Sequence, residues 1–216
     1  MRPALEKTGL RVGEDVFLAF APERVDPGRK VPAFQDIPVV VGADDAMSAR
    51  LAVLALSPVA RQVVPVSSTL VAETAKLLEN VFRNVNIALV NQLALLCDRM
   101  GIDVWEVISA AATKPYGFMP FWPGMVGGHC IPVDPYYLAW KAREFDFHMD
   151  FIELAARVNE DMPYYIAERV LLLLNGRFHG RNPRLFVVGV TFKRDVADLR
   201  YSPAIKLIEI LLKHGA

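Results

Sequence analysis

Cys130 has the surroundings of a reactive thiol. Two glycines, Gly127 and Gly128, precede it closely, a carboxylate, Asp134, follows four residues later, and prolines stiffen the far side. Glycines let the backbone bend tightly and let a substrate approach it closely, and the thiolate is the nucleophile in cysteine chemistry. We therefore predict that Cys130 is presented at the wall of a cleft rather than buried in a core.

The second cysteine and the neighbouring histidine are given structural interpretations. Cys97 lies in an apolar helical run and is predicted to be a small buried hydrophobe. Two cysteines in such different settings form no disulfide framework. His129 is not predicted to bind a metal, because adjacent side chains rarely chelate one ion and no second His/Cys cluster has ligand spacing. The side chains of adjacent residues also point apart, so His129 and Cys130 are not predicted to form a Cys-His dyad. His129 is therefore interpreted as loop structure.

Lys76 and Asn80 are four residues apart in a helical run, so they share one helix face. A lysine and an amide side by side on a buried helix form a donor pair for a developing oxyanion. The alternative is a lysine whose stem covers apolar surface while its ammonium reaches water, next to an amide that bonds a neighbouring helix. The helix alone leaves both interpretations open.

The elements that must position these residues fall into three segments, of which the first covers about residues 1–66. A strand, a loop of turn-forming residues, a second strand, a helix and a third strand are predicted there, and this order is typical of parallel α/β structure. The predicted strands and helix cover 15–21, 37–42, 43–56 and 63–66.

The second segment, about residues 67–175, is predicted to be helical. Its first helix runs to Met100 and is apolar around most of its circumference, which implies burial on several sides. Shorter helices are predicted over 103–112, 134–143 and 150–174. A long loop over 113–135 contains Cys130, and loops of this length inside a compact domain are usually functional.

The third segment, 181–216, is predicted to supply a buried strand over 184–190, a charged loop and a helix from Ser202 to about Lys213. The predicted fold is therefore α/β at both ends with an all-helical centre. One strand and one helix do not close a domain, so this segment is interpreted as the start of one.

Composition narrows the function classes. The net charge is zero, which gives no support for a nucleic acid or an anionic membrane as partner. No apolar run reaches the roughly 18 residues that span a bilayer, and no signal-peptide core follows Met1. The 53% hydrophobic content predicts apolar helix surface buried against another chain. We expect a reduced, cytoplasmic protein.

Five motifs in order resemble the UDP-glucose/GDP-mannose dehydrogenase family. They are Ala-Pro-Glu-Arg-Val-Asp-Pro-Gly at 21–28, Glu-Thr-Ala-Lys-Leu-Leu-Glu-Asn at 73–80, Asn-Gln-Leu-Ala at 91–94, the Cys130 stretch at 127–135, and the run over 188–204 that begins Val-Gly-Val-Thr-Phe-Lys. The stretch Thr-Lys-Pro-Tyr-Gly-Phe-Met-Pro-Phe at 113–121 most resembles the branch that oxidises UDP-N-acetylglucosamine, with UDP-N-acetylmannosamine and UDP-glucose left open.

The resemblance implies two oxidations at C6 of a UDP-sugar, from alcohol to carboxylate, with two NAD consumed. Cys130 is then the nucleophile that gives a thiohemiacetal and, after hydride loss, a thioester, and the Lys76 ammonium favours its thiolate form. Lys76 and Asn80 hold the oxyanion, while Glu23 and Asp134 manage protons and the hydrolytic water.

The family's substrate-binding residues map onto further positions. They are Arg24, Lys114, Gly127, Gly128 and Lys193. The resemblance also implies that 1–66 is the end of an NAD-binding domain, that 67–175 is a substrate and dimerisation domain forming a homodimer, and that 181–216 begins a UDP-binding domain.

Two departures from the family pattern are present. The Gly-x-Gly-x-x-Gly loop of a dinucleotide-binding domain does not occur, so we expect little or no dehydrogenase activity from this chain alone. The loop before Cys130 is one residue shorter than usual, with Met125 near the lost glycine. An inactive homodimerisation module is therefore the alternative function. Related enzymes such as 6-phosphogluconate or 3-hydroxyisobutyrate dehydrogenase share the Lys and Asn four apart but need no cysteine, so Cys130 decides against them.

Overall fold

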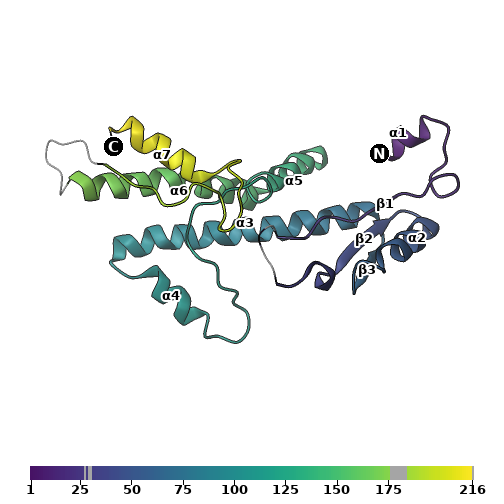
Figure 1. Ribbon diagram of the computed structural model, residues 1–216, viewed down its shortest axis with the longest axis horizontal. Helices are drawn as coiled ribbons and strands as arrows, with labels where there is room; N and C mark the ends of the chain where they lie inside the picture. The colour runs from purple at the N-terminus through teal and green to yellow at the C-terminus, as the bar shows by residue number, and fades with distance from the viewer. Residues whose placement is uncertain (27, 29–30, 176–183, 216) are drawn as a thin grey trace. The chain divides into compact units, whose positions relative to one another are not determined.

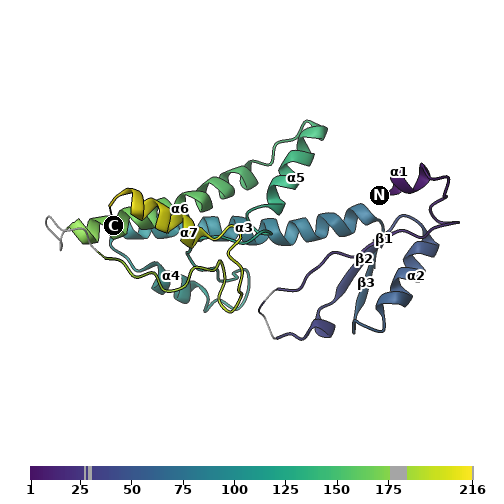
Figure 2. The same ribbon diagram turned by 45° about the horizontal axis from the view of Figure 1, so that its top comes forward.

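The computed structural model describes residues 1–26, 28, 31–175 and 184–215, which form two compact units, 1–79 and 80–216 (Figures 1 and 2). The fold is mixed α/β and mostly helical, with one three-stranded sheet, which confirms the predicted fold class. Pro27 of the first family motif and residues 181–183 of the third predicted segment lie outside the described residues.

The first unit contains the sheet, whose strand order is β1-β2-β3. Strand β2 (Val39–Ala43) pairs parallel with β3 (Val63–Val66) and antiparallel with the two-residue β1 (Ala19–Phe20). Helix α2 (Ala46–Leu56) connects the parallel pair, as predicted. The short helix α1 (Arg2–Glu6) and a 3₁₀ turn, η1 (Phe34–Asp36), complete this part of the chain.

The first strand is shorter than predicted because a side chain takes one of its backbone donors. The Ser48 hydroxyl accepts the N–H of Leu18 at 3.1 Å and donates to Asp45 at 2.6 Å. Asp45 in turn caps α2 by accepting the N–H of Ser48, and these hydrogen bonds from Ser48 lower the pKa of Asp45. The residues before β1 are thus joined to α2 instead of to a neighbouring strand.

Helix α3 (Thr69–Met100) begins in the first unit and continues into the second. The Ser68 hydroxyl accepts the N–H of Val71 at its start, and Gly101, with a φ of +70°, ends it. Both signals are visible in the sequence, and the predicted helix is confirmed.

The second unit consists of helices around the remainder of α3. These are α4 (Val104–Ala111), α5 (Asp134–Ala142) with the 3₁₀ turn η2 (Arg143–Phe145), α6 (Asp150–Asn175) and α7 (Pro203–Lys213). Helix α6 contacts α3 through Asn159, and α7 packs on α6 (Figures 1 and 2). The α6–α7 contact buries Ala167, Ile210 and Leu211.

The predicted buried strand over 184–190 is absent. This stretch pairs with no other strand in the part of the chain that the structure describes, and the side chains of Phe186 and Val188 are 91% and 87% exposed. A strand needs the backbone groups of a neighbour, and apolar residues alone do not provide one. The Ser202 hydroxyl donates to the Val190 carbonyl at 2.7 Å and so joins this stretch to the start of α7.

Helix α3 is not buried on several sides within one chain, contrary to the prediction. Phe82, Leu89 and Leu96 are 46%, 62% and 52% exposed. The buried side of the same helix carries Asn84 and Asn91. Along this part of α3 these large apolar side chains are exposed, while the interior receives two amides together with the smaller Ala88, Val90 and Cys97.

Candidate active site

The Cys130 loop turns directly into α5. The carbonyl of Cys130 accepts the N–H of Val133 at 3.2 Å and the N–H of Asp134 at 2.8 Å. Asp134 is the first residue of α5, with Pro135 beside it in the first turn, where a missing N–H costs nothing. This turn fixes Asp134 a short distance along the backbone from Cys130, whose side chain is exposed as predicted.

Asn80 and Asp134 are brought together, although 54 positions separate them in the sequence. The Asn80 side-chain amide donates to an oxygen of the Asp134 carboxylate at 2.6 Å, and Asn80 is 5% exposed. A side-chain amide has two N–H donors, so this hydrogen bond leaves one donor for a second acceptor. The arrangement holds a buried donor and a carboxylate next to the turn that carries the thiol.

Gly127 and Gly128 are required by close packing of the chain on itself. A Cβ at Gly127 overlaps Pro203 and Phe192, and a Cβ at Gly128 lies 2.9 Å from the Phe192 ring. Gly128 also has a φ of +85°, which side chains other than hydrogen rarely adopt. In this structure the space that glycine leaves is filled by Phe192 and Pro203, while contact of the two glycines with substrate stays a prediction.

His129 contacts the same phenylalanine, in agreement with its interpretation as loop structure. Its ring centroid is 6.5 Å from that of Phe192, in an edge-on arrangement. The residues around Phe192 are held by Arg200, whose guanidinium donates to both oxygens of Asp198. Hydrogen bonds from Arg200, with a smaller contribution from the charge of His129, lower the pKa of Asp198 to about 2.

Lys193 lies in this same turn, next to Phe192. The Thr191 hydroxyl donates to the carbonyl of Lys193 at 2.9 Å, and the Phe192 N–H donates to the carbonyl of Asp198 at 3.4 Å. The turn that carries Lys193 is therefore packed, through Phe192, against the loop that carries Cys130.

Three buried asparagines form a network that the sequence did not reveal. Asn91, which is 0% exposed, bonds both backbone groups of Gly124, accepting its N–H at 2.8 Å and donating to its carbonyl at 3.0 Å. Asn91 also donates to Asn159 at 2.9 Å, and Asn159 donates to Asn84 at 2.7 Å. The network joins α3, α6 and the loop before Cys130. Amides seven residues apart in an apolar helix are the signal that could have indicated it.

The remaining predicted residues have contacts of their own, and three of them belong to the first unit. Lys114 has its ammonium 5.3 Å from the centroid of the Tyr116 ring. In the first unit, Arg24 donates to the carbonyl of Pro38 and pairs with Glu79, both at 2.7 Å. Glu23 accepts the N–H of Val25. Lys76 is half-buried on α3, and its proximity to Cys130, like that of Glu23, stays a prediction.

The described residues contain neither a candidate metal centre nor a membrane-spanning helix. No three His, Cys, Asp or Glu side chains within the described ranges are grouped so that they could hold a metal ion. Of the helices in those ranges, none combines the length and the apolar character needed to cross a membrane.

Relatives of the chain are nucleotide-sugar dehydrogenases. It is 43% identical to "Protein CapL" of Staphylococcus aureus over 216 residues, covering 99% of this chain and 51% of that protein. It is 40% identical over 220 residues to a UDP-N-acetyl-D-glucosamine 6-dehydrogenase of Pseudomonas aeruginosa, with the same two coverages. The solved structure of a UDP-D-ManNAc dehydrogenase from Pyrococcus horikoshii matches with a TM-score of 0.87 and 35% identity, over 98% of this chain and 50% of that one.

Part of the chain also matches a known protein family. Residues 70–161 match the central domain of the UDP-glucose/GDP-mannose dehydrogenase family, and this part of the chain belongs to that family, as its motifs indicated. The chain spans about half the length of the curated relatives it matches.

Proposed function

We propose that this chain supplies the substrate-oxidising part of a nucleotide-sugar 6-dehydrogenase that acts on UDP-N-acetylglucosamine. One observation carries the proposal: the Cys130 turn places a thiol and the Asp134 carboxylate at one end of α5, and the buried amide of Asn80 bonds that carboxylate. Relatives named for UDP-N-acetylglucosamine and for UDP-N-acetylmannosamine make the second sugar the competing substrate.

The chemistry of the chain's own residues begins with the C6 aldehyde of the sugar. The Cys130 thiolate forms a bond from sulfur to C6, and the carbonyl oxygen becomes an oxyanion that the second Asn80 donor and Lys76 stabilise. At the thioester level, Asp134 takes a proton from water as the water attacks the carbonyl carbon, and the C–S bond breaks. The products are a carboxylate and the restored thiol, with Glu23 as the second proton-handling group.

NAD is the hydride acceptor of the complete enzyme, but the residues present do not form a cradle for it. A Gly-x-Gly-x-x-Gly loop is missing from the sequence. Gly42, the glycine of β2, does not offer an open backbone either, since the carbonyl of Ser68 occupies the place that its Cβ would take. No step through NAD is therefore assigned to a residue of this chain.

Alkylation of Cys130 in the presence of sugar nucleotides tests the proposal. The 6-aldehyde of UDP-N-acetylglucosamine should slow alkylation at least about tenfold more than UDP-N-acetylglucosamine itself, because only the aldehyde forms a bond to sulfur. Asn80→Ala should remove most of that difference. Equal alkylation rates with the aldehyde and the alcohol would contradict the proposed role of Cys130.

A second candidate function is homodimerisation through α3. Phe82, Leu89 and Leu96 are spaced by seven residues and therefore follow one face of the helix, where all three are exposed. A stripe of this kind is typical of a helix that packs on another helix. The candidate partner is a second copy of the chain, in which the two stripes cover one another.

Light scattering at micromolar concentration tests this second function. The chain should have the mass of a dimer, and Leu89→Glu combined with Leu96→Glu should give a folded monomer. Glu106→Gln on α4, a change of charge away from the stripe, serves as the control and should leave the dimer intact. A monomeric parent chain would remove the second function.

A further inference from the structure

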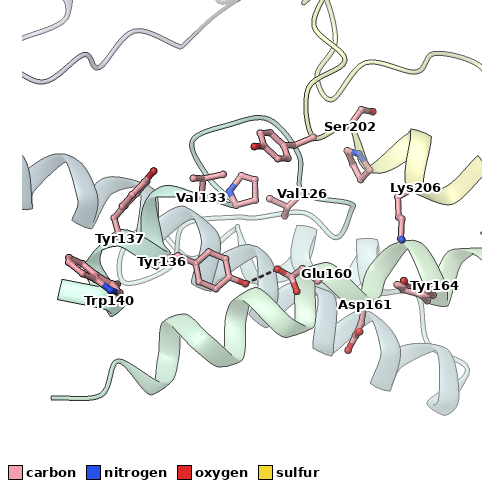
Figure 3. A pocket seen from close by; sticks show the side chains of 13 residues that line it. Val126, Val133, Tyr136, Tyr137, Trp140, Glu160, Asp161, Tyr164, Ser202 and Lys206 are labelled. Atoms are coloured by element: carbon pink, nitrogen blue, oxygen red, sulfur yellow. Dashed lines mark hydrogen bonds between the residues drawn. The ribbon is translucent and has the colours of Figure 1, made fainter. Parts of the chain in front are cut away.

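A cavity of about 1130 Å³ lies in the second unit between α5, α6 and the start of α7 (Figure 3). Val126, Pro132 and Val133 of the Cys130 loop form part of its wall, and Ser202 and Pro203 form another part. A molecule bound in this cavity therefore touches the residues on either side of the Cys130 turn.

Aromatic rings from two helices line the cavity. Tyr136, Tyr137 and Trp140 come from α5, and Tyr164 comes from α6 (Figure 3). The side chain of Trp140 is 63% exposed and that of Tyr164 is 50% exposed, so ring surface is open to a ligand. The faces of aromatic rings carry partial negative charge and attract cations as well as apolar groups.

Glu160 adds a fixed negative charge beside the rings. The Tyr136 hydroxyl donates to one of its carboxylate oxygens at 2.6 Å (Figure 3). Burial and the neighbouring Glu160 raise the pKa of Tyr136 to about 12, so this hydroxyl keeps its proton at neutral pH. A carboxylate has about four acceptor positions, and the Tyr136 hydroxyl uses one of them. Asp161 is the second acidic residue of the lining.

One cation of the chain already occupies an aromatic face in this cavity. The ammonium of Lys206 is 5.6 Å from the centroid of the Tyr164 ring. Lys206 is the one basic residue among the described lining residues, against two acidic ones, so the lining carries net negative charge. The same surroundings suit a second cation on the rings of α5.

We propose that this cavity is a binding site for a small organic cation that carries an aromatic or apolar group. The cationic centre lies between Glu160 and the ring of Trp140, and the apolar part lies against Tyr137 and Val133. Binding here requires none of the proposed dehydrogenase chemistry, because neither the thiol of Cys130 nor a nucleotide takes part.

Isothermal titration calorimetry of the 216-residue chain with benzyltrimethylammonium tests the site. Saturable binding in the high micromolar to millimolar range is expected from one carboxylate and several ring contacts. Benzyl alcohol and phenylacetate are the neutral and anionic controls, and both should bind more weakly. Absence of saturable binding by the cation, or stronger binding of phenylacetate, would overturn the proposal.

Three variants locate the bound cation. Glu160→Gln keeps an acceptor for Tyr136 but removes the charge, and it should weaken binding about fivefold. Lys206→Met removes the competing positive charge and should strengthen binding about twofold. Glu168→Gln, a matched change on an exposed part of α6 outside the cavity wall, should have no effect. Thermal unfolding confirms that each variant is folded. Equal affinities for the parent, Glu160→Gln and Lys206→Met would place the cation elsewhere and overturn the assignment.

Discussion

Helix α3 buries amide side chains among small apolar ones, whereas several of its large apolar side chains are exposed. Asn84 and Asn91 lie inside, bonded to Asn159 and to the Gly124 backbone. Phe82, Leu89 and Leu96 point the other way. Residues seven apart share one helix face, and these three are each offset by two positions from the series that contains Asn84 and Asn91, which turns them to the opposite face. The amides of Asn84, Asn91 and Asn159 bond one another and Gly124 within one chain, and the covering of the exposed face by a second copy is the proposed second function. Helix α3 fixes a loop on one side and leaves the other side for the proposed contact with a second copy.

The contacts of the buried face of α3 also explain how the Cys130 loop is held. Asn91 replaces the backbone partners that a loop lacks, because it bonds both the N–H and the carbonyl of Gly124. Further along, Phe192 fills the space beside Gly128. On the exposed face of α3, Phe82 has a ring contact in place of buried hydrogen bonds: its centroid lies 5.7 Å from that of Phe121, edge-on. Substitutions on the two faces are therefore expected to have different consequences.

The largest effect is expected for Asn91→Ala. This change removes the partners that Asn91 gives to the N–H and carbonyl of Gly124 and to the side-chain oxygen of Asn159, in a buried or part-buried place. It should therefore lower the free energy of unfolding by about 2–4 kcal/mol. Urea denaturation measures the change.

Asn86→Ala is the matched control, since Asn86 is on the same helix and bonds only the carbonyl of Phe82 at an exposed position. Its expected cost is below about 1 kcal/mol. Equal losses in the two variants would show that the buried network does not stabilise the chain.

A smaller effect is expected for Gly128→Ala, which tests whether Phe192 holds the loop. The variant should lose about 1–3 kcal/mol more than Gly117→Ala, because both glycines have positive φ but only Gly128 has a ring against it. Denaturation of both variants, alone and with Phe192→Ala, separates the two costs. If the loss of stability caused by Gly128→Ala is the same with and without Phe192→Ala, the Phe192 ring is not the reason why position 128 needs a glycine.

The smallest effect is a dependence on pH at Asp198. Its pKa in the folded chain is about 2, below the ordinary value, because Arg200 bonds the ionised form. A depressed pKa stabilises the folded state above the pKa of the unfolded chain, about 3.9. That contribution is lost as the pH falls from about 4 to about 2. Unfolding curves should show Asp198→Asn less stable than the parent at pH 5 and equal to it near pH 2, and a constant difference would contradict the assignment.

Local signals in the sequence predicted the helices, but contacts between residues far apart in the sequence were not predicted. The start of α3 at Ser68, its end at Gly101 and the cap of α4 at Asp103 each depend on a few adjacent residues. The unpaired stretch over 184–190 was predicted as a strand from its apolar residues, but strand formation depends on a neighbour that is not part of the local sequence.

For the candidate site as well, features set by adjacent residues were predicted and contacts between distant residues were not. Cys130, Asp134 and the turn between them were visible because they are adjacent in sequence. Their partner Asn80 was predicted from a family motif, but its hydrogen bond to Asp134 spans 54 positions and cannot be derived from spacing. The Asn84–Asn91–Asn159 network was missed for the same reason, and the role of Phe192 beside the two glycines became visible only in three dimensions.

The pH dependence of Cys130 labelling tests the central claim, that this chain assembles a nucleophilic thiol, most directly. Cys97→Ala silences the other cysteine, which is buried, and a small alkylating reagent is followed by mass spectrometry. Half-maximal labelling is predicted well below the ordinary cysteine value of about pH 8.5, with a return toward that value in Lys76→Ala. Half-maximal labelling near pH 8.5 in both proteins, or no labelling at all, would contradict the claim and leave the α3 assembly as the function of this chain.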